Sequence, residues 1–301
     1  MKLSPTNVAH VFSSATGLDY KRLAQYIQKG VKQLYIHPDD MQAYKQFISK
    51  SAESIFLDPE TLPEKKLISL LNMTEQSITE VYSQFNIEVE TAEATQKLIK
   101  NYVKIMTEKP QTLAMILKLV SHGNYLYYHS IAVSIMSMLI ARATGQLNQK
   151  TLELVGFGGF LHDIGCTQLT KEVVCSPEEF TPDQWLEMRS HPQIGLKMVE
   201  GTDNIPDEVR YIIYQHHEEP SGHGYPNALE GKVIYYPAKI VALADCFSAL
   251  ISTRPFRPAY SIEKALRIIQ EASGQGANGK YDHDLVAILI SLFGKNLKKA
   301  A

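Results

Sequence analysis

Cysteine is scarce in this chain, and neither sign of charge dominates. The three cysteines among 301 residues, Cys166, Cys175 and Cys246, form an odd set without the spacing of metal ligands. Such a set favours a reducing compartment over a disulfide scaffold. The formal net charge is only -2, which gives no reason to expect DNA or an anionic membrane surface as a partner. An anionic ligand would therefore have to be held by local cations.

Long hydrophobic runs are also missing. The first ten residues, MKLSPTNVAH, lack the apolar stretch of a signal peptide. The most apolar run, Ile131–Ala141, has 11 residues and contains serines, so it is too short to cross a bilayer. Hydrophobic content of 45% is ordinary for a globular protein, and 301 residues are enough for one large or two modest domains. We therefore expect a cytoplasmic protein without a membrane span.

Residues 1–57 read as a small α/β unit with a sensory or regulatory role. Helical spacing in Leu18–Lys29 stops at Gly30, a residue typical of a helix end. The segment Val31–Ile36 alternates enough to predict a short strand, and a proline-led helix is expected over Asp39–Ser49. Neither His10 nor His37 has a ligand partner at useful spacing, so nothing here suggests catalysis.

Residues 58–109 read as a helical linker. Its first residues, Asp58–Pro63, have linker composition, and two amphipathic helices are expected over 63–85 and 91–106. These helices could connect a sensory unit to an output unit. They could also pack in the seam of a homodimer, and the sequence leaves both possibilities open.

Residues 110–301 predict an all-α domain, which makes the whole chain α+β. Helices are expected over 111–121, 125–143, 150–161, 182–190, 192–200, 207–217, 237–252, 261–272 and 283–293. Thr181, Ser261 and Asp282 have the side chains of helix caps. Two glycine-bearing loops, 218–237 and 274–281, are expected to border a site, because long ordered loops in compact domains often do.

Histidine and aspartate stand where core residues would be expected. Seven of the ten histidines fall between residues 122 and 223. His162-Asp163 ends an apolar helical run, and Asp245 lies among apolar neighbours. A single histidine of this kind is more often a hydrogen-bonded core residue than a ligand. The doublet His216-His217 changes that balance, because adjacent helical residues point about 100° apart and can serve two neighbouring cations. Two divalent metals would also partner the buried carboxylates.

Seven motifs in order carry a resemblance to a known family. They are His129-Ser130, His162-Asp163-Ile164-Gly165, His191-Pro192, His216-His217-Glu218, Gly222-His223-Gly224-Tyr225-Pro226, Ala244-Asp245 and Arg254-Pro255-Phe256-Arg257. Together they resemble the HD-GYP family, a subgroup of the HD-domain phosphohydrolases, over about residues 110 to 295. The resemblance implies an HD-type helical bundle that hydrolyses cyclic di-GMP, or a related cyclic dinucleotide, at a site with two divalent metals, iron or else manganese.

The resemblance also assigns roles by position. The implied metal ligands are His129, His162, Asp163, His191, His216, His217 and Asp245, with Asp163 bridging. Asp163 and Tyr225 are the implied catalytic residues. Arg254 and Arg257, three apart on one helical face or turn, are implied to contact the substrate together with Tyr225. The loop that contains Tyr225 is implied as a surface for signalling proteins.

Several positions depart from the family pattern. The lysine that usually follows His-Asp-Ile-Gly is Cys166, and the usual Trp-Asp pair is Pro220-Ser221. Two acidic positions are Ser248 and Thr253, and the glutamate that accompanies a third metal is Tyr125, which favours two metals. These losses leave open an alternative function: a weakly active or inactive module that binds metal and nucleotide, or protein partners, as a signalling element.

Overall fold

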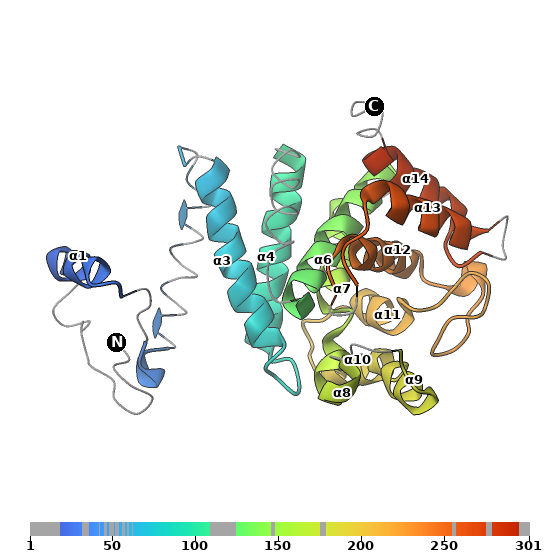
Figure 1. The fold of residues 1–301 in the computed structure, drawn as a ribbon, viewed down its shortest axis with the longest axis horizontal. Helices are drawn as coiled ribbons and strands as arrows, with labels where there is room; N and C mark the ends of the chain where they lie inside the picture. Colours follow the sequence, from blue (N-terminus) through green and yellow to red (C-terminus); the bar gives the residue numbers. More distant parts are fainter. Residues whose placement is uncertain are drawn as a thin grey trace. The chain divides into compact units, whose positions relative to one another are not determined.

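The computed structural model describes residues 19–31, 36–41, 43–44, 47, 51, 54–55, 58, 60–61, 63–108, 125–145, 148–174, 179–254, 257–274 and 279–294. The chain divides into two compact units, Met1–Pro59 and Glu60–Ala301. The elements of each unit are labelled in Figure 1. The described residues are mostly helical, as expected for the larger part of the chain.

In the first unit, the helix α1 (Tyr20–Gln28) is confirmed. Asp19 caps it by accepting hydrogen bonds from the backbone N–H groups of Lys21 and Arg22. A 3-10 turn, η1, covers Pro38–Asp40. Residues 32–35 of the predicted strand and residues 42, 45, 46, 48 and 49 of the predicted helix over 39–49 lie outside the described residues, whereas residues 41, 43, 44 and 47 of that helix are helical. The α/β character expected for residues 1–57 is therefore not shown, since the described residues of this unit contain helix and turn alone.

The second unit is a helical bundle whose bounds match the sequence predictions closely. Its helices are α3 (Pro63–Val81), α4 (Val89–Glu108), α6 (Tyr125–Ala143), α7 (Gln149–Leu161), α8 (Lys171–Val174), α9 (Pro182–Met188), α10 (His191–Glu200), α11 (Asp207–Gln215), α12 (Tyr236–Ile251), α13 (Ile262–Ser273) and α14 (His283–Gly294), with 3-10 turns η2 (Ile164–Gln168) and η3 (Gly231–Val233). The helix expected over 111–121 lies outside the described residues.

Local capping sets several of these bounds. Thr181 and Gln184 form a reciprocal capping box at the start of α9. Ser261 accepts a hydrogen bond from the backbone N–H of Lys264, and Asp282 accepts one from Asp284. All three predicted caps are therefore confirmed.

The core of the second unit forms where α7 packs between α6, α11 and α12. Helix α6 buries residues all round its axis, including Val133, Ile135 and Ile140. Glycines allow α7 to approach its neighbours closely. A Cβ on Gly158 would lie 2.5 Å from Ile212 on α11, and one on Gly159 would lie 3.0 Å from the Ser134 backbone on α6. Figure 1 shows α13 and α14 at one end of this unit and α8, α9 and α10 at the other.

The two helices expected as a linker contact the bundle. The Thr202 hydroxyl, after α10, donates to the carbonyl of Ile87 between α3 and α4 at 2.6 Å, and α4 packs on α7. The two helices also contact each other, since the hydroxyls of Tyr102 and Thr74 lie 2.7 Å apart. The predicted boundaries at 57 and 109 stay predictions.

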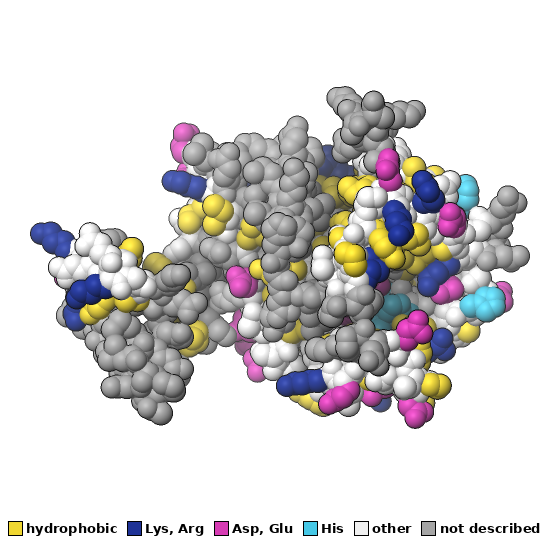
Figure 2. Space-filling model, viewed as in Figure 1, with side chains coloured by type: hydrophobic (Ala, Val, Ile, Leu, Met, Phe, Trp, Pro, Cys, Tyr) yellow, Lys and Arg dark blue, Asp and Glu magenta, His cyan; other side chains and the backbone are white. Residues whose placement is uncertain are grey.

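The described surface of the second unit carries both signs of charge. On the face shown in Figure 2, basic and acidic side chains are interspersed. Among the described residues, no helix is both long and apolar enough to cross a bilayer.

The close approach of α7 and α11 predicts a large effect of Gly158→Val. The new side chain would overlap Ile212, so we expect the free energy of unfolding to fall by at least about 2 kcal/mol. Gly201→Ala is the control, because a Cβ at Gly201 meets nothing within 4 Å. Urea unfolding followed by circular dichroism measures both variants, and equal stabilities would contradict the packing described here.

Candidate metal centre

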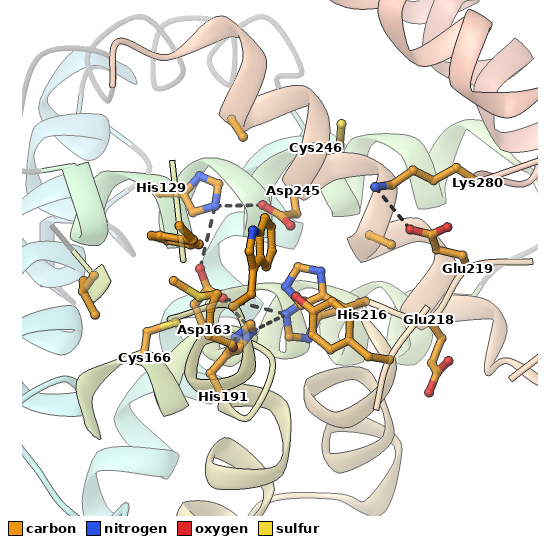
Figure 3. Close-up of a pocket in the computed structure, with 18 of the residues that line it drawn as sticks. His129, Asp163, Cys166, His191, His216, Glu218, Glu219, Asp245, Cys246 and Lys280 are labelled. Carbon is orange, nitrogen blue, oxygen red and sulfur yellow. Dashed lines mark hydrogen bonds and ion pairs between the residues drawn. The ribbon is translucent and has the colours of Figure 1, made fainter. Parts of the chain in front are cut away.

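The seven predicted metal ligands come from separate segments of the chain and meet in one cluster. His129 lies on α6, His162 and Asp163 follow α7, His191 begins α10, His216 and His217 follow α11, and Asp245 lies on α12. Figure 3 shows His129, Asp163, His191, His216 and Asp245 gathered around one point. The structure therefore brings together side chains that lie up to 116 residues apart in the sequence.

Three of the imidazoles are oriented in the same way, each through a backbone carbonyl three residues earlier. His162 Nδ1 lies 2.8 Å from the Gly159 carbonyl, His191 Nδ1 2.7 Å from that of Met188, and His216 Nδ1 2.8 Å from that of Ile213. With Nδ1–H donating to the carbonyl, the lone pair of Nε2 faces the cluster. The acceptors lie in the last turns of α7, α9 and α11, so three negative helix ends also point at this region, which favours a cation.

Asp163 lies between two sets of imidazoles. Its Oδ2 is 3.3 Å from His162 Nε2 and 4.0 Å from His129 Nε2. Its Oδ1 is 3.3 Å from His191 Nε2 and 3.8 Å from His216 Nε2. Each carboxylate oxygen thus faces a different set, which is the arrangement of a carboxylate that bridges two cations.

Two groups of side chains are able to hold a metal ion, and they share Asp163. One group contains Asp163, His191, His216 and His217, and the other contains His129, His162 and Asp163; within each group, the ligand atoms lie within 4.8 Å of one another. Asp245 extends the second group, since its Oδ1 is 2.9 Å from His129 Nε2.

The chemistry of His162 fits a metal. Its Nε2 is fully buried and has no hydrogen-bond partner, although Asp163 Oδ2 is 3.3 Å away. Leaving a buried polar atom unsatisfied costs about 1–3 kcal/mol. A cation at this point would give the nitrogen a partner, and imidazole nitrogens with carboxylate oxygens are ligands that iron, manganese and zinc all accept.

The electrostatics of the cluster show strong coupling between its members. Burial lowers the pKa of His162, but Asp163 and Asp245 outweigh burial and raise it to about 9. Burial lowers the pKa of His191 to about 4, and His216 adds to this effect while Asp163 opposes it. Burial would raise the pKa of Asp163, but His162 and its neighbours hold it well below its usual range. The Asp163 carboxylate is therefore ionised and can pair with a cation.

Ser248 contacts the Nδ1 side of the His129 ring. Its hydroxyl is fully buried and lies 3.3 Å from His129 Nδ1. This contact gives Nδ1 of the ring a polar partner, as backbone carbonyls do for His162, His191 and His216. The serine stands where the family pattern has an acid, so the position keeps a polar partner for the ring despite the substitution.

A cavity of about 700 Å³ opens onto the cluster. Its lining combines three kinds of side chain. Ligand candidates include Asp163 and His191, the cations are Arg254, Arg257 and Lys280, and the aromatic residues include Phe180, Trp185 and Tyr225. The cavity therefore offers metal ligands, positive charge and flat apolar surface to one bound molecule.

The two predicted substrate arginines both line this cavity. They pair through backbone hydrogen bonds of 2.8 and 3.1 Å, so they lie on a turn rather than a helix. The Arg257 guanidinium donates to the carbonyls of Leu250 at 3.1 Å and Ala249 at 2.8 Å, at the end of α12. Burial and the charge of Arg257 lower the pKa of Arg254 to about 10. Arg257 thus holds the end of a helix, and its contact with substrate stays a prediction.

Tyr225 lies beside the first group of ligands, the one that contains His191 and His217. Its ring stacks on His217 with centroids 4.6 Å apart, and the His191 ring is 6.4 Å away. Burial, reinforced by Asp163, raises the pKa of the Tyr225 phenol. The phenol is therefore neutral near pH 7, so it can donate a hydrogen bond but cannot act as a base.

Glu218 directly follows the doublet His216-His217 in the sequence, but its side chain faces the loop that carries Tyr225. Its buried carboxylate accepts hydrogen bonds from the backbone N–H groups of Asn227 at 2.7 Å and Leu229 at 2.8 Å. Figure 3 shows this carboxylate pointing away from the imidazoles. It fixes the loop that carries Tyr225, a role that local sequence patterns do not reveal.

Two further cavity residues concern the positive charge that the family pattern supplies with a lysine at the position of Cys166. Burial, together with the nearby Asp163 carboxylate, raises the pKa of Cys166, so the thiol is neutral and supplies no charge. Lys280, from the predicted loop 274–281, lies 3.2 Å from Glu219 and provides a cation on the cavity wall. The sequence signal for Lys280 is its position within the glycine-bearing loop 274–281, which is expected to border a site.

The bundle and its histidine–carboxylate cluster define a helical metal-binding domain. The HD domain family matches residues 93–285, so the chain belongs to this family. The curated relatives named below are cyclic di-GMP phosphodiesterases, the class of enzyme that the resemblance to the HD-GYP subgroup implies.

Two curated relatives are named as cyclic di-GMP phosphodiesterases. The response regulator RpfG of Xanthomonas campestris is 34% identical over 46% of this chain and 36% of its own length. PA4108 of Pseudomonas aeruginosa is 28% identical over 68% of this chain and 48% of its own length. The chain therefore spans less than half the length of these relatives.

Among solved structures, Bd1817, an HDG"Y"P protein of Bdellovibrio bacteriovorus, has the same fold. Its TM-score is 0.71 at 20% identity, covering 91% of this chain and 87% of that one.

The bridging position of Asp163 predicts that Asp163→Asn removes bound metal. A neutral amide cannot serve two cations, so we expect elemental analysis to show loss of both ions. Glu218→Gln is the matched control, because this buried carboxylate bonds the loop and leaves the cluster intact. Full metal content in Asp163→Asn, or equal losses in both variants, would contradict the bridge.

Metal binding should release protons at neutral pH. The pKa of His162 is about 9 in the metal-free protein, whereas a ligand nitrogen must be deprotonated. Metal affinity should therefore rise with pH until the solution reaches that pKa. Calorimetry at pH 7 in buffers of different ionisation enthalpy should show roughly one proton released per protein. Identical heats in all buffers would rule out a protonated His162.

Proposed function

We propose that this protein is a binuclear metal-dependent phosphodiesterase that hydrolyses cyclic di-GMP or a related cyclic dinucleotide. The observation that carries the proposal is Asp163, whose two oxygens face separate imidazole sets on the floor of a cavity lined by cations. The proposed ligands are the seven residues of the cluster, and the proposed metals are iron, with manganese next.

The ligand set suits phosphodiester hydrolysis. Two divalent cations, when bound, supply Lewis acidity toward phosphoryl oxygens and lower the pKa of an attached water. The chain's own residues do the rest. Asp163 and the imidazoles fix where charge is concentrated, and Ser248 and the helix-end carbonyls keep the rings in place.

Other cavity residues would hold the substrate. Arg254 presents guanidinium donors that match phosphoryl oxygens. The neutral Tyr225 phenol can donate a hydrogen bond beside His191 and His217. Lys280 adds a third cation at the cavity wall. A dianionic cyclic dinucleotide fits these charges, and the names of the relatives support this class of substrate.

A specific observation also favours the alternative of a weakly active signalling module. Cys166 supplies no charge where the family has lysine, and Arg257 is engaged with the end of α12. Two of the cationic contacts expected for the phosphates are thus reduced, whereas the ligand cluster is retained. Such a module would bind metal and nucleotide without rapid turnover.

One experiment separates the two functions. Protein purified without oxygen and loaded with iron or manganese is incubated with cyclic di-GMP, and the products are resolved by chromatography. Metal-dependent formation of a linear dinucleotide, absent in Asp163→Asn, supports the phosphodiesterase. Binding measured by calorimetry without turnover supports the signalling module. If the protein neither binds nor hydrolyses any cyclic dinucleotide, both proposed functions are contradicted.

We also propose roles for the rest of the chain. Residues 1–57 act as a regulatory α/β domain and residues 58–109 as the connection to the metal-binding domain, in a cytoplasmic homodimer. The exposed side chains of Ile68, Phe85 and Val89 on and beside α3 and α4 support a self-association surface. The loop that carries Tyr225 is proposed to contact signalling proteins.

The contacts of Arg257 with the end of α12 predict that removal of this arginine affects stability, whereas removal of Arg254 is expected to affect substrate binding. Arg254→Ala should raise the dissociation constant for cyclic di-GMP by about tenfold, the effect of one charge-assisted hydrogen-bonding group, without loss of metal. Arg257→Ala should chiefly lower the melting temperature, because the carbonyls of Leu250 and Ala249 lose their donor. Calorimetry and thermal unfolding measure these effects, and the reverse pattern would exchange the two assignments.

A further inference from the structure

One side of the cavity is aromatic. Phe180 precedes α9, Trp185 lies on α9, and Tyr225 lies in the loop after α11, and all three line the cavity. We call these three residues the aromatic wall. The rings of Phe180 and Trp185 meet edge to face, with centroids 5.2 Å apart and planes at 81°. This surface lies next to the ligand group of His191 and His217, through the contacts of Tyr225.

Arg189 joins the two halves of the aromatic wall. Its guanidinium carbon lies 5.8 Å from the centroid of the Trp185 ring and 5.6 Å from that of Tyr225. Cation–π contacts of this kind hold rings in a defined orientation. The indole on α9 and the phenol ring on the loop therefore share one cationic neighbour.

Burial in the hydrophobic core does not explain Trp185. Helix α9 has no buried residue, and Trp185, the sole tryptophan of the chain, is 47% exposed. The Thr181 capping box stabilises the start of the helix, and the Glu187 carboxylate accepts a hydrogen bond from the backbone N–H of Thr170. A large aromatic ring left half exposed at a cavity beside metal ligands is surface available to a ligand.

We propose that Trp185 is the stacking platform for one nucleobase of the substrate, with Phe180 and Tyr225 bordering it. This inference rests on the proposed function. The phosphates of a cyclic dinucleotide need the metal ligands and cations, whereas its bases are flat, weakly polar rings that need an apolar face. The aromatic wall is such a face in the same cavity.

The proposal also limits what Trp185 contributes to specificity. Stacking on an aromatic ring tolerates any base, because every base has a π-face. Trp185 therefore sets the affinity for purine cyclic dinucleotides as a class and does not distinguish guanine from adenine. Its removal should weaken the binding of cyclic di-GMP and cyclic di-AMP to a similar degree.

The test measures binding to the metal-loaded chain of 301 residues by calorimetry, with a hydrolysis-resistant phosphorothioate analogue of cyclic di-GMP as the probe. Trp185→Ala should raise the dissociation constant by about tenfold, as expected for loss of one stacked base, and Trp185→Phe should retain most of the affinity. Leu186→Ala is the matched control, since Leu186 is a 74% exposed neighbour on α9. All variants should keep their metal.

The single tryptophan provides a second readout, because in the wild-type protein its emission should change in step with the calorimetric binding curve. Equal affinity of Trp185→Ala and wild type, or binding without any change in emission, would overturn the platform. So would a wild-type protein that does not bind the analogue. A protein that binds the analogue through Trp185 but does not hydrolyse cyclic di-GMP would contradict the proposed phosphodiesterase and support the platform.

Discussion

The position of one carboxylate, Asp163, governs the whole site. Its two oxygens contact imidazoles from different helices, so the ends of α7, α10 and α11 must converge on a single side chain. The glycines that let α7 pack tightly against α6 and α11 make that convergence possible. The buried charge in turn requires positive partners, since an isolated ionised carboxylate is costly in an apolar interior.

The ligand histidines also complete the helices that carry or precede them. The last carbonyls of a helix have no partner within it, and here the imidazoles of His162, His191 and His216 each take one. The same hydrogen bond therefore satisfies a carbonyl at the helix end and orients the imidazole ring. A shift in a helix end would turn a ring, so the fold and the metal centre constrain each other.

Most of the bundle was predictable because its signals are local. Caps such as Thr181 and Ser261 and the 3.6-residue periodicity place the helices to within a few residues. The ordered motifs of the HD-GYP resemblance predicted which histidines and aspartates form the cluster. The sequence did not reveal that Glu218 fixes the loop or that Arg257 bonds the end of α12, because these contacts depend on how distant segments meet. The expected α/β character of residues 1–57 is not shown for the described residues.

The lack of buried residues in α9 has an evolutionary consequence. Substitutions along this helix change the cavity wall without disturbing the hydrophobic core, so their cost to stability is small. Residues of α6, α7 and α12 have no such freedom, because they build the core and carry ligands together. Descendants of this chain could therefore acquire new ligand preferences through α9 while the centre that contains Asp163 stays the same.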